Sequence, residues 1–286
     1  MSYDSILLGA VFAAVVVVIA GRAGALSGGG AVAAFFVGTL TFGTLRFTGA
    51  AVLLAFFVPA VVLSRVGRAR KRELVDIGKH GPRDAMQVLA NGGVATACAL
   101  ASLGWHDVRW EFAFAGAYAA AAADTWGTEI GTLLRQPPRS ILTLRSVATG
   151  ISGGVTLAGT LAEIAGAAWI GCVLIGMLWL GLSAAMHARG LSIPPSVFAP
   201  MMFERPLALL VVAVPLGGIA GALVDSVLGA TVQELRFCDA CGRSCETDPH
   251  VCGSRTRVVR GIPRFSNDAV NLLATVTGAA VGFALS

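Results

Sequence analysis

The chain has 286 residues, of which 56% are hydrophobic and only 13% are charged, and its mean hydropathy is +0.77. This composition excludes a water-soluble globule of ordinary make-up and indicates an integral membrane protein. The formal net charge of +5 is concentrated in a few loops, as expected of residues that set membrane orientation. We therefore expect no nucleic-acid partner.

Apolar stretches long enough to cross a hydrocarbon core about 30 Å thick recur along the whole chain. The candidates are residues 5–21, 28–45, 49–64, 86–103, 111–134, 151–167, 168–187, 206–229 and 268–285. They predict an all-α, polytopic helical bundle that forms one membrane domain over residues 1–286, in a multi-pass protein of a prokaryotic cell membrane. The first apolar run has no basic region before it, which argues against a cleaved signal peptide.

Three basic loops constrain the topology. The positive-inside rule puts the basic loop 64–85 in the cytoplasm, and the segment with Arg135, Arg139 and Arg145 then falls on the same side. If every candidate span crosses, the basic loop 230–266 lies outside, against the rule. Two similar Gly-rich segments, 27–40 and 152–161, would resolve this conflict if both were re-entrant. Ordinary small-residue helix packing is the alternative interpretation of both segments.

Polar residues interrupt the apolar span that contains "AAAADTWGTEIG", residues 120–131. Ionisable groups at bilayer depth cost about 2.5–3.5 kcal/mol each on insertion scales, so they persist where they face protein, water or a ligand. Asp124 and Glu129 are five residues apart, roughly 140° around a helix, and we expect them to face one partner only if the helix breaks. Thr125 shares a helix face with Glu129.

Further polar clusters lie near the ends of other apolar segments. One isolated acid, Glu163, is interpreted as a helix end or an interhelical contact. The clusters comprise Asp225 and Ser226, then Asn267, Asp268 and Asn271, and a stripe at four-residue steps formed by Lys79, Arg83, Gln87 and Asn91. Singly, such amides are more often interhelical contacts than ligands. Together, carboxylates that can hold Mg²⁺ and cations that can neutralise phosphate form the set that a phosphate-handling membrane enzyme needs.

A Cys-rich loop, residues 236–266, contains four of the six cysteines in "FCDACGRSCETDPHVCG". Five side chains are candidates for the four positions of a structural zinc site: Cys238, Cys241, Cys245, His250 and Cys252. A loop of reduced thiols is the alternative, and a disulfide would require an oxidising compartment. Cys98 and Cys172 lie in apolar helices and are expected to be small core residues.

The order of the polar motifs resembles one family. The motifs are Lys79, Arg83-x-x-x-Gln87 and Asn91, then Asp124-Thr125-Trp126-x-x-Glu129, Ser152-Gly153-Gly154, Asp225-Ser226 and Asn267-Asp268-x-x-Asn271. They resemble a polytopic family once labelled domain of unknown function ninety-two, which includes the phytyl-phosphate kinase of the plant tocopherol pathway and the eukaryotic transmembrane protein nineteen. The resemblance covers nearly the whole chain, except that the Cys-rich loop departs from the plant and animal members.

The resemblance implies an isoprenoid-phosphate kinase that uses CTP or another nucleoside triphosphate and makes the diphosphate of phytyl or geranylgeranyl phosphate. In this hypothesis the catalytic, Mg²⁺-binding acids are Asp124, Glu129, Asp225 and Asp268. The phosphates are bound by Lys79, Arg83, Gln87, Asn91, Thr125, Ser226, Asn267 and Asn271. The partners are then the lipid substrate, the nucleotide and membrane lipids. The alternatives are a nucleotidyltransferase that forms a CDP-lipid, and a transporter of isoprenoid phosphate or a small anion.

Overall fold

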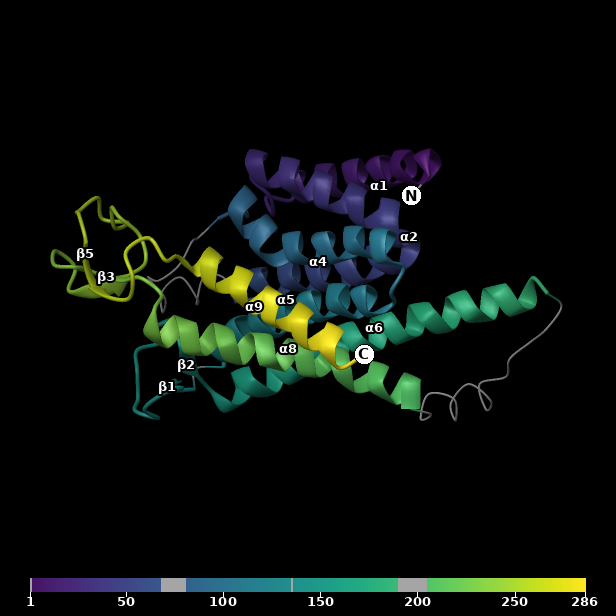
Figure 1. The fold of residues 1–286 in the computed structure, drawn as a ribbon. Coiled ribbons are helices and arrows are strands. Elements are labelled where there is room, and N and C mark those ends of the chain that lie inside the picture. The colour runs from purple at the N-terminus through teal and green to yellow at the C-terminus, as the bar shows by residue number, and fades with distance from the viewer. Residues whose placement is uncertain (1, 68–80, 135, 190–204) are drawn as a thin grey trace.

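The protein is an all-α bundle with a small β module at one end (Figure 1), as seen in a computed structural model that describes residues 2–67, 81–134, 136–189 and 205–286. The helices are α1 (Tyr3–Arg22), α2 (Gly28–Arg65), α4 (Ala85–Trp105), α5 (Arg109–Leu133), α6 (Leu157–His187), α8 (Arg205–Thr231) and α9 (Asn267–Ala284). Five helical segments of the described chain are long and apolar enough to cross a membrane: α1, α2, α4, α6 and Val211–Thr231 of α8. The predicted polytopic helical fold is confirmed.

Five short strands lie at the same end of the bundle. β1 (Arg139–Ser140) pairs antiparallel with β2 (Gly154–Val155) in the connection between α5 and α6. β3 (Leu235–Cys238), β4 (Arg243–Cys245) and β5 (Arg257–Arg260) form an antiparallel sheet in the order β4-β3-β5. We refer to residues 235–265, which contain this sheet, as the Cys-rich module.

α2 consists of two antiparallel limbs, residues 28–45 and 47–65. They meet at Arg46, whose φ of 50° and ψ of −133° are not helical. At this turn Arg46 Nη1 donates to Ser5 Oγ over 2.8 Å, near the start of α1. At the other end of the second limb, Arg65 Nη2 donates to the carbonyl of Ala23 over 2.6 Å, just past the end of α1. Each limb therefore runs the length of α1, in agreement with the expected spans 28–45 and 49–64.

The expected spans 151–167 and 168–187 are one helix, α6. Nothing in the sequence interrupts it, because the residues at the expected boundary, Gly166 to Ala168, include no proline and alanine favours helix. The Gly-rich segments 27–40 and 152–161 were expected to be re-entrant. In the structure they instead contain the starts of the long helices α2 and α6. Ser27 Oγ accepts from the Gly30 amide at the start of α2, and Thr156 Oγ1 accepts from the Gly159 amide at the start of α6.

The corrected count changes the topology that follows from the basic loops. With α2 counted as two limbs and α6 as one span, the described helices between the basic loops 64–85 and 230–266 give an even number of crossings, namely α4, α5, α6 and α8. Residues from all three basic loops then meet at one end of the bundle, because Arg65, Gln136 and Glu234 line a common cavity there. The positive-inside rule is satisfied without any re-entrant segment.

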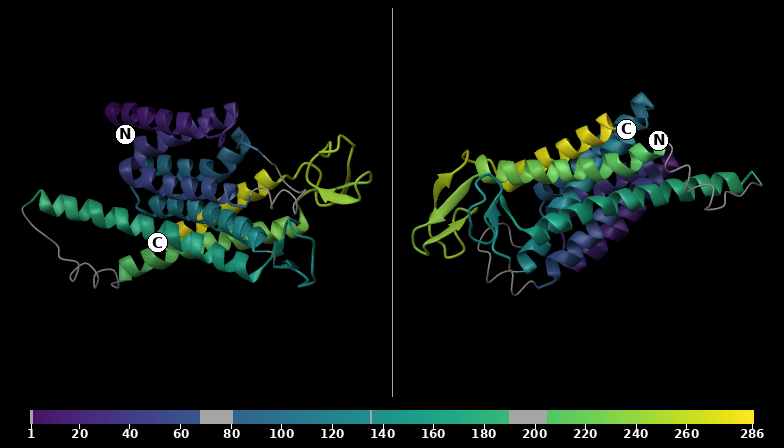
Figure 2. Two further views of the ribbon diagram at one scale, coloured as in Figure 1. Left: turned by 180° about the vertical axis from the view of Figure 1, so that it is seen from behind. Right: turned by 90° about the horizontal axis from the view of Figure 1, so that it is seen from below.

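α5 is the core of the bundle, in contact with α4, α6, α8 and α9 (Figure 2). Every residue from Phe112 to Ala123 is buried, mostly alanine, so that neighbouring helices can approach closely. The closest approach is to α9, where a Cβ added at Gly116 would overlap the carbonyl of Gly278. The polar section of the same helix begins at Asp124, where this tightly packed section ends.

Replacing Gly116 by alanine should destabilise the protein by about 1–3 kcal/mol, because the added methyl group would overlap the Gly278 carbonyl. Gly176→Ala in α6 is the matched control, since an added Cβ there meets open space. Thermal unfolding in detergent measures both variants. A Gly116→Ala variant as stable as the control would contradict this packing.

Candidate active site at the polar end of the bundle

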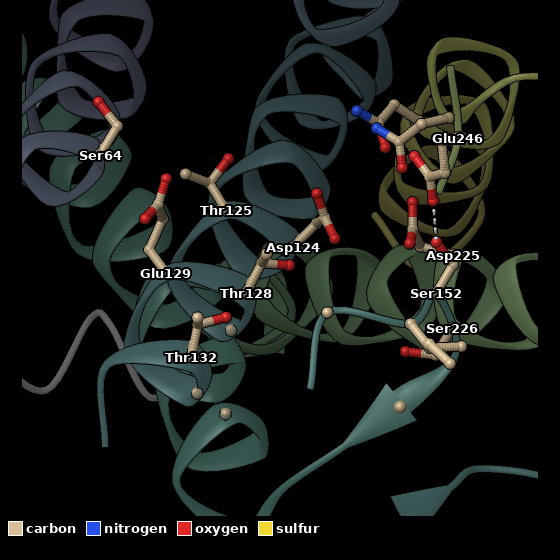
Figure 3. Close-up of a pocket in the computed structure, with 18 of the residues that line it drawn as sticks. Ser64, Asp124, Thr125, Thr128, Glu129, Thr132, Ser152, Asp225, Ser226 and Glu246 are labelled. Carbon is tan, nitrogen blue, oxygen red and sulfur yellow. Dashed lines mark hydrogen bonds between the residues drawn. The ribbon is translucent and has the colours of Figure 1, made fainter. Parts of the chain in front are cut away.

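A cavity of about 530 Å³ lies at the end of the bundle where α5 becomes polar (Figure 3). Its walls come from α4, α5, α6, α8, α9, the second limb of α2 and the turn before α6. All of the sequence-predicted phosphate and magnesium residues that the structure describes line it: Arg83, Gln87, Asn91, Asp124, Thr125, Glu129, Asp225, Ser226, Asn267, Asp268 and Asn271. Lys79 lies outside the described residues. We call this space the acidic cavity.

Asp124 and Glu129 reach the acidic cavity from an unbroken helix, because α5 continues to Leu133. In this unbroken helix the two acids do not face one partner, as expected from their angular separation. The cavity extends around the end of α5, so side chains 140° apart can line different parts of it. Figure 3 shows Glu129 beside Thr125 on one side, and Asp124 directed toward Asp225 of α8 on the other.

Glu163 of α6 also lines the acidic cavity, although it was not among the predicted catalytic acids. It lies against Gly127 of α5, where an added Cβ would come within 2.5 Å of the Glu163 side chain. Its carboxylate also interacts electrostatically with Asp124. The sequence carried a signal for this residue: Thr156, Gly159 and Glu163 follow helical spacing on one face of α6, and all three line the cavity.

Glu246 enters the acidic cavity from the Cys-rich module. Its Oε1 atom accepts hydrogen bonds from Ser152 Oγ over 2.6 Å and from Gln233 Nε2 over 2.7 Å (Figure 3). Burial raises the pKa of Glu246, while the hydrogen bond from Ser152 and the charge of Arg260 oppose that rise. No local sequence pattern predicts this residue, because its position depends on how the whole module folds back onto α8.

Arg83 is held at the edge of the acidic cavity by the turn between α1 and α2. Its amide donates to the Ala25 carbonyl, and its carbonyl accepts from the Ser27 amide, both over 3.0 Å. Gly30 permits this approach, since a Cβ there would overlap the Arg83 carbonyl. The Gly triplet at 28–30 therefore accommodates a neighbouring backbone. Burial lowers the pKa of the Arg83 guanidinium, and the nearby Glu129 carboxylate opposes that shift.

Two amides beside Arg83 are fixed by the start of α4. Asp84 caps this helix: its Oδ1 accepts from the Gln87 amide over 2.9 Å, and its own amide donates to Gln87 Oε1 over 3.1 Å. One turn later, Asn91 Nδ2 donates to the Gln87 carbonyl over 2.9 Å. These bonds hold both side chains in place before any ligand binds.

Negative groups outnumber positive ones in the described lining of the acidic cavity. Two arginines, Arg65 and Arg83, face seven acids: Asp124, Glu129, Glu163, Asp225, Glu234, Glu246 and Asp268. Glu234 is paired with Arg236, Glu129 lies near Arg83 and Glu246 lies near Arg260, yet the acids still outnumber these arginines. Like charges 4 Å apart repel by about 4 kcal/mol at an effective dielectric constant of 20. An additional cation would therefore favour the binding of a phosphate here.

The lining fits a magnesium site. Two buried oxygens, Asp225 Oδ2 on α8 and Asn271 Oδ1 on α9, have no hydrogen-bond partner among the described residues. Carboxylate and amide oxygens are the protein ligands that Mg²⁺ takes, usually one or two carboxylates together with substrate phosphates and water. The acids of the cavity would hold such an ion, whose charge would offset both their repulsion and that of a phosphate.

A second space, of about 400 Å³, adjoins the acidic cavity at Arg83. It lies between α1, α2 and α4, and we call it the apolar groove because its wall is almost entirely hydrophobic, including Phe12, Val16, Val37, Phe42, Leu54 and Phe57. Arg83, Gln87 and Asn91 line both spaces. The guanidinium of Arg83 lies 5.8 Å from the ring centres of Phe56 and Phe57. The two spaces together can accept a molecule with an anionic head and an apolar tail.

Four of the five predicted zinc ligands come together in the Cys-rich module. The ligand atoms of Cys238, Cys241, His250 and Cys252 all lie within 4.8 Å of one another. Cys245 is outside this group, and its thiol instead donates to the carbonyl of Thr247 over 3.7 Å. It ends β4, where the strand pairing with β3 determines its direction.

Comparison with known proteins identifies relatives across nearly the full length. The family described as "Integral membrane protein DUF92" matches residues 11–279. Protein PGR of Arabidopsis thaliana is 33% identical over 265 residues, 87% of this chain and 84% of that protein. An uncharacterized membrane protein of Methanocaldococcus jannaschii is 30% identical over 80% of this chain and 73% of its own. Protein VTE6, chloroplastic, of Arabidopsis thaliana is 29% identical over 52% of this chain and 47% of its own.

No solved structure matches the chain. The family match covers most of the sequence, so the chain belongs to the DUF92 family of integral membrane proteins, which confirms the family expected from the polar motifs. The relatives include plant and archaeal proteins, and the expected prokaryotic cell membrane therefore stays a prediction.

Mg²⁺ should raise the unfolding temperature of the purified protein, by the equivalent of about 2.7 kcal/mol at a concentration 100 times its Kd. Asp225→Asn should reduce this shift, because Asp225 contributes a buried carboxylate oxygen to the acidic cavity. Glu111→Gln, in the first turn of α5 at the far end of the bundle, should keep it. Equal shifts in the wild type and Asp225→Asn would exclude Asp225 from the metal site.

Proposed function

We propose that this member of the DUF92 family is an isoprenoid-phosphate kinase that transfers a phosphoryl group from CTP or another nucleoside triphosphate to phytyl or geranylgeranyl monophosphate. One observation carries the proposal: an acid-lined cavity and an apolar groove meet at a half-buried arginine, Arg83. The motif resemblance to a family that includes the phytyl-phosphate kinase supports the same substrate class. The acceptor would be a lipid phosphate with its head at Arg83 and its tail in the groove.

This reaction needs residues that position the two substrates and neutralise the negative charge of their phosphates. An oxygen of the lipid monophosphate attacks the γ-phosphorus of the nucleotide, the bond to the β–γ bridging oxygen breaks, and a nucleoside diphosphate leaves. The attacking oxygen is already ionised, so no general base has to remove a proton. Catalysis then depends on holding two anions in line and offsetting their charge.

The residues of the acidic cavity divide into three groups in this proposal. Arg83, Gln87 and Asn91 lie where the two spaces meet, and they would bind the acceptor phosphate. Asp124, Glu129, Asp225 and Asp268 also line the cavity and would hold Mg²⁺, which neutralises phosphate charge when bound. The hydroxyls of Thr125 and Ser226 and the amides of Asn267 and Asn271 would orient the nucleotide phosphates.

The proposal is tested by incubating purified protein in detergent with CTP, Mg²⁺ and phytyl or geranylgeranyl monophosphate. The expected products are the lipid diphosphate and CDP. Asp124→Asn should lower turnover by at least about 100-fold, as is typical when a group that stabilises transition-state charge is lost. Asp107→Asn, a partly exposed residue before α5 at the opposite end of the bundle, is the control for expression and folding.

Other outcomes separate the competing functions. Pyrophosphate release with formation of a CDP-lipid would indicate a nucleotidyltransferase. Substrate movement into vesicles without nucleotide consumption would indicate a transporter. Full activity in Asp124→Asn would remove the central site assignment, whichever reaction is found.

Narrowing the apolar groove should impair long-chain substrates selectively. Ala34→Phe places a ring in the groove, whereas Val32→Phe places it on the exposed side of the same helical limb. We expect Ala34→Phe to raise the KM for phytyl monophosphate at least about tenfold, the equivalent of roughly two lost methylene contacts, while a short-chain monophosphate is affected less. Val32→Phe should match the wild type for both. Equal effects on both chain lengths would argue against a tail in this groove.

A further inference from the structure

The Cys-rich module is too small to be stabilised by a hydrophobic core. It spans residues 235–265 and contains three strands of three or four residues each. Domains below about 40 residues usually need a disulfide, a metal or another chain. The module does pack against the end of α8 and the turn at Ser152, but these contacts lie at its base. Another interaction has to hold its outer part together.

The interior of the module consists mainly of candidate metal ligands. Within residues 235–265 only four residues are buried: Leu235, Cys238, Cys245 and His250. The apolar residues Val251, Val258, Val259 and Ile262 are exposed, and Phe237 and Phe265 are only partly buried. Apart from Leu235, the buried positions where a core would be are therefore occupied by thiols and an imidazole.

The geometry of these side chains fits one zinc ion. Cys238 Sγ lies 3.7 Å from Cys252 Sγ, and His250 Nδ1 lies 3.1 Å from Cys252 Sγ. With Zn–S bonds of about 2.3 Å, two sulfur ligands of a tetrahedral site lie about 3.8 Å apart. A disulfide would require about 2.05 Å, and none of the six cysteines forms one. Cys238 and Cys241 also have the C-x-x-C spacing that is typical of structural zinc sites.

The same segment that carries the ligands also carries Glu246. β4 ends at Cys245, Glu246 follows directly, and the ligands His250 and Cys252 come four and six residues later. The Glu246 carboxylate accepts from Ser152 and Gln233 in the wall of the acidic cavity. This segment therefore connects the ligand cluster, through His250 and Cys252, to the acidic cavity, through Glu246.

We propose that Cys238, Cys241, His250 and Cys252 bind one structural Zn²⁺ ion, and that this ion holds the Cys-rich module so that Glu246 is positioned in the acidic cavity. The three thiols release their protons to solvent on binding, and the neutral imidazole supplies the fourth ligand. The zinc ion is closed to substrate by four protein ligands. Its effect on the cavity is exerted through Glu246, a positioning residue, and this second part rests on the function proposed above.

The zinc site is tested on the full chain, purified in detergent without chelators, by elemental analysis. We expect about one zinc per chain in the wild type and less than about 0.1 in Cys238→Ser and Cys252→Ser. Cys245→Ser is the matched control inside the module, and Cys172→Ser is the control in α6, and both should retain zinc. Growth with Co²⁺ should give the thiolate-to-cobalt absorption of a tetrahedral site, which identifies the ligands independently of metal content.

Absence of zinc from the wild type, with none taken up from added ZnCl₂, would overturn the site. Full zinc content in Cys238→Ser would overturn the ligand assignment. Where a cysteine variant fails to fold, the wild type treated with a chelator replaces it. The module should then become sensitive to protease and regain protection with ZnCl₂, and continued protection without metal would contradict a structural role.

The link to the cavity is tested with Glu246→Gln. This variant should keep one zinc per chain and a protected module, yet should raise the KM for the substrates or lower kcat at least about tenfold. Removing zinc from the wild type should produce a similar loss, which ZnCl₂ restores. Unchanged turnover in both cases would disprove the link. Because zinc content and protease protection need no substrate, they remain valid tests if the kinase function proves wrong.

Discussion

Carboxylates that gather in a partly enclosed cavity repel one another, and this repulsion decides what the polar end of the bundle can bind. The seven acids of the described lining outnumber the arginines near them, Arg65, Arg83, Arg236 and Arg260. The repulsion among such carboxylates is reduced when they bind protons or cations. A phosphate compound adds more negative charge, so a cation bound with it would favour its entry. In the proposed reaction, phosphate affinity and metal affinity should therefore be coupled.

Close helix packing keeps these acids at fixed positions despite their repulsion. The section of α5 before Asp124 consists mostly of alanine, and its neighbours α6, α8 and α9 approach it at glycine contacts. Small residues give little apolar burial per side chain, but they allow backbones to come close and leave few rotamers to adjust. The acids lie at the end of this rigid section, on neighbouring helices that cannot easily move apart.

Much of the site could be predicted from sequence because membrane burial makes polar residues informative. An acid in an apolar span is costly unless it faces protein, water or a ligand, and the described members of every predicted polar cluster line one cavity. The angular argument about Asp124 and Glu129 agrees with the structure, because the helix does not break and the two acids line different parts of a cavity that extends around the end of α5. The division of residues 151–187 into two spans failed because hydropathy marks apolar length and not helix ends.

Two residues of the site could be identified only from the tertiary structure. Glu163 shares one helix face with Thr156 and Gly159, but this spacing indicates a place in the site only once α6 is known to pack on α5. Glu246 lies in a polar loop where acids are ordinary, and only the return of the Cys-rich module to α8 makes it part of the cavity. The exclusion of Cys245 from the ligand cluster depends in the same way on the pairing of β3 with β4. Sequence spacing alone leaves all five candidate ligands equivalent.

The position of Arg83 connects the two halves of the proposed reaction. Its guanidinium is held over Phe56 and Phe57 on the groove side, while its charge interacts with Glu129 on the cavity side. An acceptor whose tail occupies the groove therefore presents its phosphate beside Glu129. The nucleotide must then approach from the opposite wall, where Asp225 and Glu246 lie (Figure 3). In-line transfer between the two requires that the phosphates meet near Asp124, which lies between these walls and has the buried part of α5 directly behind it.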